Sequence, residues 1–202
     1  MDHHSQPLPD RHLDLGCGAR PRNPYQRKHL YGVDFQASAP GAQVEIAAAN
    51  LSIAPIPFPT GHFGSVSAYD FLEHVPRILP TTDGLGTRFP FIELMDEIWR
   101  VLSPGGLLYA VTPAYPHPTA FQDPTHVNVL TDETHHYFTQ PRLLGRMYGF
   151  HGTFELVRQV RVRPRPDYEP ANPGWYQGLR RWRLGLQGHA SHLVWELRAV
   201  KS

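Results

Sequence analysis

The sequence has little cysteine, no long apolar run and almost no excess of charge of one sign. Its single cysteine, Cys17, excludes a disulfide framework and any zinc site built from several cysteines. No uninterrupted apolar run reaches the roughly 18–20 residues that span a bilayer, which excludes an integral membrane protein. Lys and Arg number 19 and Asp and Glu number 18, so we expect neither nucleic acid nor a membrane surface as partner. The N-terminus MDHHSQPLPD lacks the apolar segment of a signal peptide, and we expect a cytoplasmic protein.

The residues that are present suit one globular domain over residues 1–202. Hydrophobic residues make up 41% of the chain and aromatic residues 11%, which is enough for a packed core. Proline is abundant, at 21 residues, but it clusters in 54–60, 113–124 and 164–173, where it stiffens loops and leaves the periodic segments intact.

Short apolar runs that end in polar residues indicate parallel strands. The expected strands are 12–18, which runs into a glycine turn, then 30–34, 42–47, 64–69 and 107–112. Apolar residues at helical spacing predict a helix over 89–102, with Pro90 in its first turn. Segments 154–163 and 192–200 alternate apolar and polar residues, which predicts an antiparallel pair at one edge. The fold class is therefore α/β, a Rossmann-like seven-stranded, mostly parallel sheet with an antiparallel C-terminal edge pair.

A proline-rich insertion over 164–190 separates the last two predicted strands. It contains the basic and aromatic stretch Trp175–Gln187, which can form a short helix. Long insertions in compact domains are more often functional than idle, so we expect a lid or an acceptor-binding element here. A plain surface helix is the next interpretation, and a nucleic-acid surface is the least favoured one, because the net charge is close to zero.

The turn Gly16-Cys17-Gly18 follows the first predicted strand, and Asp34 ends the second one. Glycine lets the backbone pass close to a ligand, and a carboxylate at the next strand end can accept hydrogen bonds from two ribose hydroxyls. The pair predicts a ligand that contains a nucleoside. The third glycine of the dinucleotide pattern G-x-G-x-x-G is missing, and Pro21 and Pro24 leave poor material for a full helix, which disfavours an NAD-dependent oxidoreductase.

Three motifs in the expected order resemble the class I S-adenosylmethionine-dependent methyltransferases, specifically their small single-domain "type 11-like" group. They are LDLGCG (13–18), IPFPTGHFGSVSAYDFLEHV (56–75) and ELMDEIWRVLSPGGLLYAVTP (93–113). The resemblance covers roughly residues 11–140. It implies a Rossmann-like fold and S-adenosyl-L-methionine as cofactor, and it leaves the methyl acceptor open.

The resemblance also implies a cofactor site. Asp14 would orient the glycine turn or the amino group of the cofactor, Asp34 would hold its ribose, and Asp70 would lie near its amino-acid part or the acceptor. Two residues, Asn50 and Leu51, would flank the adenine. The implied cofactor-binding residues are Asp14, Gly16, Cys17, Gly18, Asp34, Asn50, Leu51 and Asp70.

Methyl transfer from a sulfonium is an in-line displacement, so a general base is needed only where the acceptor loses a proton. The candidate catalytic residues are His126, with Asp123 as its orienting partner, and His74. These residues also have purely structural interpretations. His74 can start a helix, and Asp123 with Pro124 can form a turn whose side chains bond to their own backbone.

A metal site is the other interpretation of the histidine-rich segment. Its candidate ligands are His117, Asp123, His126, His135 and His136. Their spacing matches no compact metal-binding signature, and adjacent histidines cannot easily face one ion, so we expect no metal from this set.

The sequence therefore predicts methyl transfer from S-adenosylmethionine to a small-molecule or saccharide-like acceptor. The alternative is a non-catalytic, cofactor-binding or regulatory protein of the same fold. A cofactor that binds without turnover would favour that alternative.

Overall fold

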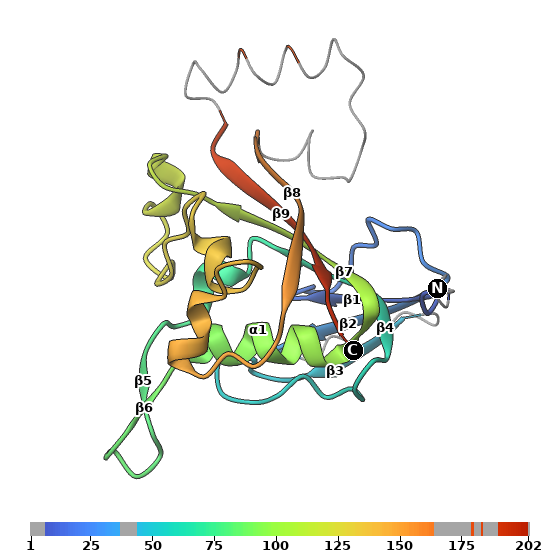
Figure 1. Ribbon diagram of the computed structural model, residues 1–202, viewed down its shortest axis with the longest axis horizontal. Helices are drawn as coiled ribbons and strands as arrows, with labels where there is room; N and C mark the ends of the chain where they lie inside the picture. Colours follow the sequence, from blue (N-terminus) through green and yellow to red (C-terminus); the bar gives the residue numbers. More distant parts are fainter. Residues whose placement is uncertain (1–6, 37–43, 164–178, 180–182, 184–189, 202) are drawn as a thin grey trace.

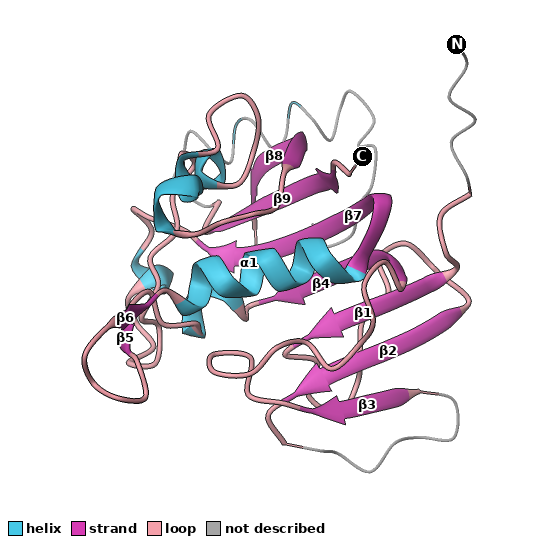
Figure 2. Ribbon diagram, turned by 60° about the horizontal axis from the view of Figure 1, so that its bottom comes forward, coloured by secondary structure: helices cyan, strands magenta, loops and turns pink. Residues whose placement is uncertain are grey.

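The computed structural model describes residues 7–36, 44–163, 179, 183 and 190–201. Its centre is one seven-stranded sheet of strand order β3-β2-β1-β4-β7-β9-β8 (Figures 1 and 2). The strands are β1 (Arg11–Leu15), β2 (His29–Asp34), β3 (Glu45–Ala48), β4 (Phe63–Tyr69), β7 (Leu102–Pro113), β8 (Phe154–Val162) and β9 (His192–Ala199). The first five pair in parallel, and β9 runs antiparallel to both β7 and β8. The predicted fold class, including the antiparallel edge pair, is confirmed.

Smaller elements gather at the carboxyl edge of the parallel strands. They are the hairpin β5 (Leu79–Pro80) with β6 (Thr87–Arg88), and the 3-10 helices η1 (Leu72–His74), η2 (Pro118–Ala120), η3 (Thr134–Tyr137) and η4 (Leu144–Tyr148). In Figure 2 the arrowheads of the parallel strands, the hairpin and the segment that follows β7 all lie toward the same side. None of the described helices has the length and apolar character needed to cross a bilayer.

One face of the sheet is covered by helix α1 (Pro90–Val101), as Figure 2 shows. Its predicted bounds were correct to within one residue at each end, and Pro90 occupies the first turn. Its apolar stripe is buried against the sheet and consists of Phe91, Leu94, Met95, Ile98 and Val101.

Strand β7 begins earlier than the sequence indicated. We expected Pro104-Gly105-Gly106 to separate the helix from a strand at 107, but Leu102 already pairs with Phe63. The extra residues form an irregularity in the pairing with β4, and Gly105 has a φ of +75°. A bulge of this kind tolerates proline and often contains glycine. Pro104-Gly105-Gly106, which would interrupt a regular strand, therefore lies within β7.

The other face of the sheet has a different cover. Tyr109 and Val111 of β7 point to it, because neighbouring residues of a strand alternate between faces. Residues 16–28 contain no helix, as Pro21 and Pro24 predict, and they place Tyr25 on this face. The Tyr25 hydroxyl donates to Glu196 Oε1 at 2.6 Å, and its ring meets Tyr109 edge to face at 6.3 Å. The loop is therefore fastened to β9.

A row of buried polar groups lies on this second face. His12 bonds Ser65 Oγ and Ser67 Oγ, each at 2.8 Å, and Ser67 donates to Asp14 Oδ1 at 2.6 Å. Burial lowers the pKa of His12 to about 3, and the nearby Arg27 adds to this effect. Burial raises the pKa of Asp14 to about 6. Near neutral pH, His12 is uncharged and Asp14 is the only charged member of the row.

Parts of three predictions fall outside the described residues. The insertion 164–190 and the helix expected within Trp175–Gln187 lie there except for residues 179, 183 and 190. The start of the predicted strand 42–47 also lies outside, and the described part of that strand is β3, at Glu45–Ala48.

Candidate functional site

The glycine turn is tied directly to the end of β2. The backbone N–H of Gly16 donates to Val33 O at 2.8 Å, and that of Gly18 donates to Asp34 Oδ2 at 2.9 Å. Both glycines have positive φ, +64° and +56°, a conformation that disfavours side chains. The predicted closeness of turn and carboxylate is therefore present.

Gly16 also leaves no room for a larger residue. A Cβ there would lie 2.5 Å from Cδ2 of Phe71, which follows β4. The side chain of Phe71 therefore lies directly against the glycine turn, a close approach that glycine permits because it has no Cβ.

These segments border a pocket of about 380 Å³, which we call the glycine-turn pocket. This volume lies within the roughly 300–1,000 Å³ of typical small-ligand sites. Six predicted site residues line it: Gly16, Asp34, Asn50, Leu51, Asp70 and His74. They come from four separate strand ends, so the topology and not chain proximity brings them together.

Asp70 has a strained backbone in this pocket. Its φ is +49°, which is uncommon for a residue with a side chain, and its N–H donates to Val111 O. Its Oδ1 lies 3.2 Å from Nε2 of the buried His192. Such strain persists where the surroundings fix it, and it is concentrated at functional sites.

Three other predicted residues, Asp14, Cys17 and Gly18, are not among those that line the pocket. Asp14 accepts from Ser67 and from the backbone N–H of Arg22 at 2.8 Å, so it holds the loop that follows the glycine turn. Cys17 packs against β2, where a Cβ on Gly32 would lie 2.5 Å from its Sγ. Burial raises the pKa of the Cys17 thiol to about 12, and Asp14 and Asp34 add to the shift. Gly18 contacts Asp34 through its backbone.

A cluster of titratable groups lies beside this pocket, and we call it the Glu-His-His cluster: Glu73, His74 and His126. Glu73 is buried and His126 is partly buried, with side-chain exposures of 2% and 9%. Burial raises the pKa of Glu73 to about 8, and Asp70 adds to the shift. Glu73 Oε2 accepts from Thr112 Oγ1 at 3.0 Å, while Oε1 has no hydrogen-bond partner among the described residues.

Asp123 is connected to His74, and not directly to His126 as we expected. Its Oδ1 accepts from Thr125 N at 2.8 Å and from Thr125 Oγ1 at 2.6 Å, so the Asp-Pro turn is also formed. Thr125 Oγ1 lies 3.0 Å from Nδ1 of His74. Among described residues, the link from Asp123 to His126 is a backbone bond from His126 N to Asp123 O.

The other histidines of the segment have local partners. His117 caps η2 and bonds Thr119, and His135 bonds Thr139. His136 lies 3.3 Å from Glu133. Within the described part of the chain, the Glu-His-His cluster is the only group of three or more His, Cys, Asp and Glu side chains close enough to share an ion.

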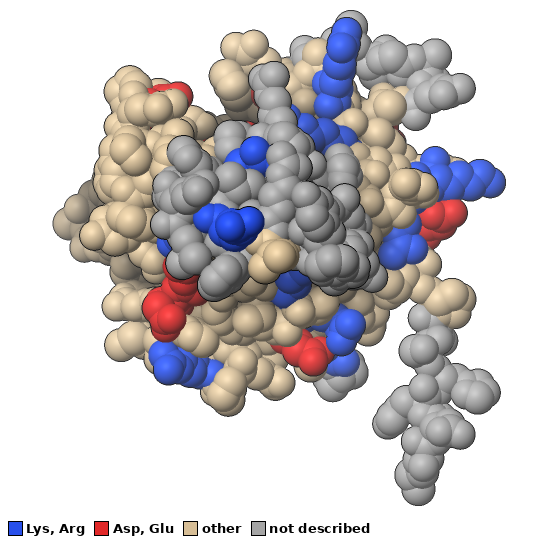
Figure 3. Space-filling view, turned by 90° about the horizontal axis from the view of Figure 1, so that it is seen from above, with Lys and Arg blue, Asp and Glu red and all other residues tan. Residues whose placement is uncertain are grey.

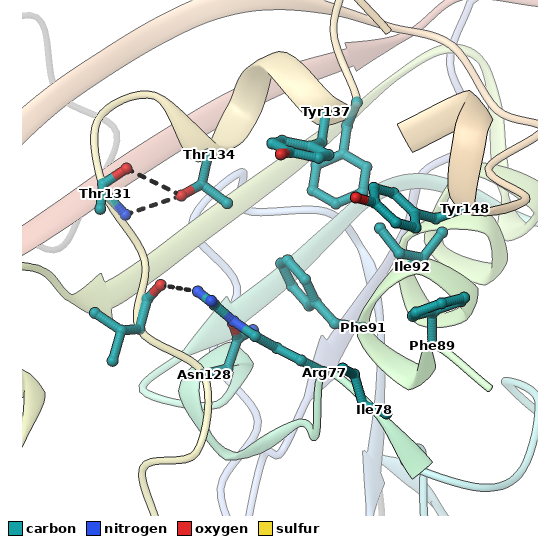
Figure 4. Close-up of a pocket in the computed structure, with 12 residues that line it drawn as sticks. Arg77, Ile78, Phe89, Phe91, Ile92, Asn128, Thr131, Thr134, Tyr137 and Tyr148 are labelled. Atoms are coloured by element: carbon teal, nitrogen blue, oxygen red, sulfur yellow. Dashed lines mark hydrogen bonds between the residues drawn. The ribbon is translucent and has the colours of Figure 1, made fainter. Parts of the chain in front are cut away.

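A second cavity of about 430 Å³, which we call the aromatic pocket, is lined by residues between Arg77 and Tyr148. In Figure 4 the rings of Phe89, Phe91, Tyr137 and Tyr148 surround it, and Arg77 extends along its floor. Arg77 donates to Asn128 Oδ1 at 2.7 Å and to the carbonyl of Val129. Asn128 N in turn donates to Glu73 O at 2.9 Å, so this pocket is joined to the Glu-His-His cluster by one residue.

Charges are mixed on the face shown in Figure 3. The described Lys and Arg side chains are spread over that face, with fewer Asp and Glu side chains between them.

Sequence reasoning missed two residues of this site. Glu73 stands directly before His74 in the LEH segment, but it was not expected to turn inward. Thr125 lies in the predicted Asp-Pro turn, and only the fold shows that its hydroxyl reaches back to η1.

Residues 13–110 match the family described as "Methyltransferase domain". No curated protein matches the chain. A Haloferax volcanii protein described as a methyltransferase and solved with the activator Trm112 is similar over 98% of this chain and 86% of its own, at 14% identity and a TM-score of 0.57. The [4+2]-cyclase SpnF is similar over 95% of this chain and 75% of its own, at 17% identity and a TM-score of 0.53. The N-methyltransferase NodS from Bradyrhizobium japonicum WM9 was solved with S-adenosyl-L-homocysteine. It is similar over 95% of this chain and 78% of its own, at 13% identity and a TM-score of 0.51.

Proposed function

We propose that this chain, whose residues 13–110 match the family described as "Methyltransferase domain", is a class I S-adenosylmethionine-dependent methyltransferase that transfers a methyl group to a small-molecule or saccharide-like acceptor. The observation that carries the proposal is the glycine-turn pocket. Gly16 of the turn, Asp34, which would hold the ribose, and the pair Asn50 and Leu51, which would flank the adenine, all line this one cavity. When bound, S-adenosylmethionine supplies an electrophilic methyl group on its sulfonium.

In this proposal the pocket residues bind and orient the cofactor. Asp34 accepts hydrogen bonds from the ribose, since each of its oxygens retains a lone pair beyond its bonds to Gly18 and Gln36. Asn50 and Leu51 flank the adenine, and Asp70 lies toward the amino-acid part or the acceptor. Asp14 acts from behind by holding the loop at Arg22, while Cys17 and Gly18 contribute backbone.

His126 and His74 are the proposed groups that help the acceptor lose its proton. His74 lines the glycine-turn pocket, and the rings of His74 and His126 meet edge to face at 4.9 Å. Asp123 supports His74 through Thr125. Positioning of the acceptor supplies much of the acceleration in such a displacement, so these residues matter most for acceptors that must be deprotonated.

The aromatic pocket supports a small acceptor. Its rings offer flat apolar faces that stack on planar molecules or on the apolar faces of sugars. Arg77 and Asn128 add polar groups at one side. We propose that this cavity holds the part of the acceptor that lies away from the methylated atom.

The cofactor assignment is tested by thermal unfolding with S-adenosylhomocysteine and with NAD. A hundredfold excess over Kd should raise Tm by roughly 5–10 °C for the first compound, and NAD should leave Tm unchanged. Asp34→Ala should remove most of the shift, whereas Asp83→Ala, on the exposed β5–β6 hairpin, should keep it. An unchanged shift in Asp34→Ala would remove the ribose assignment.

A screen of acceptors with a labelled methyl donor tests transfer itself. Transfer to small hydroxyl- or amine-bearing compounds is the expected result. Binding of S-adenosylhomocysteine without transfer to any acceptor would favour the non-catalytic alternative.

A further inference from the structure

The Glu-His-His cluster joins two imidazoles and a carboxylate in one place. One ligand atom from each of Glu73, His74 and His126 lies within 4.8 Å of the other two. Glu73 and His74 come from η1, and His126 comes from a segment held against it by two bonds to the carbonyl oxygen of Glu73, from Val127 N at 3.0 Å and Asn128 N at 2.9 Å. The backbone therefore fixes the spacing of the three side chains.

The contact between Glu73 and His126 has the wrong length for a hydrogen bond. Oε1 and Nε2 are 4.0 Å apart, whereas a direct N–H···O bond spans roughly 2.7–3.2 Å. Two bonds of about 2.0–2.2 Å to a shared cation at a tetrahedral angle hold their ligand atoms roughly 3.3–3.6 Å apart, so the two atoms lie within about 0.7 Å of the separation that one ion requires. Glu73 Oε1 is buried and has no hydrogen-bond partner among the described residues, so this oxygen lacks the partner that a buried carboxylate needs.

The surroundings of His74 prepare it as a ligand. Thr125 has one hydroxyl proton and donates it to Asp123 at 2.6 Å. Its oxygen must therefore accept from His74, whose Nδ1 lies 3.0 Å away. This tautomer keeps the lone pair of Nε2 available, and such support of a histidine by a second polar group is typical of metal sites.

We propose that the Glu-His-His cluster binds one divalent transition-metal ion of the zinc type. Two histidines and one carboxylate suit Zn²⁺, Fe²⁺ or Co²⁺ better than Mg²⁺, which prefers oxygen ligands. Three protein ligands leave open positions, and His74 also lines the glycine-turn pocket. A hydroxyl acceptor bound to the ion would lose its proton more easily. This catalytic role rests on the proposed function, whereas the binding of the ion does not.

The experiment is a calorimetric titration of the chelator-treated full chain with Zn²⁺, and with Co²⁺ followed by its visible absorption. The chain has 13 histidines, so variants isolate the contribution of the site. His126→Ala and Glu73→Gln should each weaken the tightest event by at least about 100-fold, and Thr125→Val by about 10-fold. His151→Ala, which removes an exposed histidine bonded to Asp96, should bind as the wild type does. Mg²⁺ should not compete.

Circular dichroism and affinity for S-adenosylhomocysteine check the fold of each variant, and Thr125→Val keeps the test open if Glu73→Gln does not fold. Equal Zn²⁺ affinity in the wild type and His126→Ala would overturn the proposal, as would the absence of binding. A chain with a bridging water in the gap would bind no ion. If such a chain also transfers methyl groups in the presence of chelator, the metal site is refuted and the proposed function stands. A chain that binds Zn²⁺ but not S-adenosylhomocysteine supports the metal site and refutes the proposed function.

Discussion

The glycine-turn pocket and the Glu-His-His cluster lie at the same edge of the sheet but are assembled in different ways. The pocket uses residues that directly follow strands, and its shape depends on backbone at Gly16 and Asp34. The cluster depends on a long segment after β7 that folds back onto η1 through Val127 and Asn128. Strand ends set the first region, whereas long-range contacts set the second, so the two should respond to substitution separately.

The largest expected effect separates cofactor binding from transfer. His126→Ala should lower the transfer rate by about 100- to 10,000-fold for an acceptor that must lose a proton. Affinity for S-adenosylhomocysteine should change by less than about twofold, because His126 does not line the glycine-turn pocket. Single-turnover rates and calorimetry measure the two quantities, with His151→Ala as the control. Equal losses in both would break the comparison and assign His126 a structural role.

Two glycines of the turn sharpen the first half of the comparison. Gly16→Ala places a methyl group 2.5 Å from Phe71 Cδ2 at a φ of +64°, whereas the corresponding position at Gly18 is open, at a φ of +56°. We expect Gly16→Ala to weaken S-adenosylhomocysteine binding about 100-fold, and Gly18→Ala about 10-fold or less, since only backbone strain acts there. Calorimetry on both variants decides this, and equal affinities would show that the approach of Phe71 does not shape the pocket.

The row of buried polar groups on the second face of the sheet predicts a pH effect. His12, with its pKa lowered to about 3, contributes stability that is complete above pH 6.5 and is lost as the pH falls toward 3. Asp14, with its pKa raised to about 6, contributes stability below pH 3.8 that is lost as the pH rises through 6. The two slopes oppose each other between pH 4 and 6.

Asp14→Asn removes one of these slopes. The variant should lose more free energy of unfolding than the wild type on going from pH 6 to 4, by about 1 kcal/mol per pH unit. Urea unfolding at several pH values measures this difference. Adding His12→Gln should flatten the profile again, and a variant profile parallel to that of the wild type would contradict the opposed pair.

The smallest expected effect concerns the loop that replaces the first crossover helix. Tyr25→Phe removes the 2.6 Å bond to Glu196 and should lower the free energy of unfolding by about 1 kcal/mol. Denaturant unfolding measures this loss. Tyr115→Phe, an exposed tyrosine on the segment after β7, is the matched control and should change stability by less than about 0.5 kcal/mol.

Local pattern predicted most of the fold and the glycine-turn pocket. Apolar spacing located α1 to within one residue at each end, and the strand ends carried Gly16 and Asp34 to one cavity. The early start of β7 was missed, because a bulge accommodates Pro104 and the glycines that follow it. Local propensity rules treat those residues as a break.

The acceptor side was predicted only in part. His74 and His126 do meet, but the inward turn of Glu73 and the bridge through Thr125 depend on contacts between positions about 50 apart in sequence. Periodicity carries no information about such pairings. The expected pairing of Asp123 with His126 assumed sequence neighbours, whereas the fold offers Asp123 a route to His74.

The position of β9 has a consequence for the order in which this sheet can be completed. This strand follows all others in sequence, yet it lies between β7 and β8 and pairs with both. During synthesis, the five parallel strands can assemble while the edge of β7 is still open and β8 has no neighbour. Closure must wait until residues 192–199 leave the ribosome, and until then the open edge of β7 and the unpaired strand β8 are exposed to other chains.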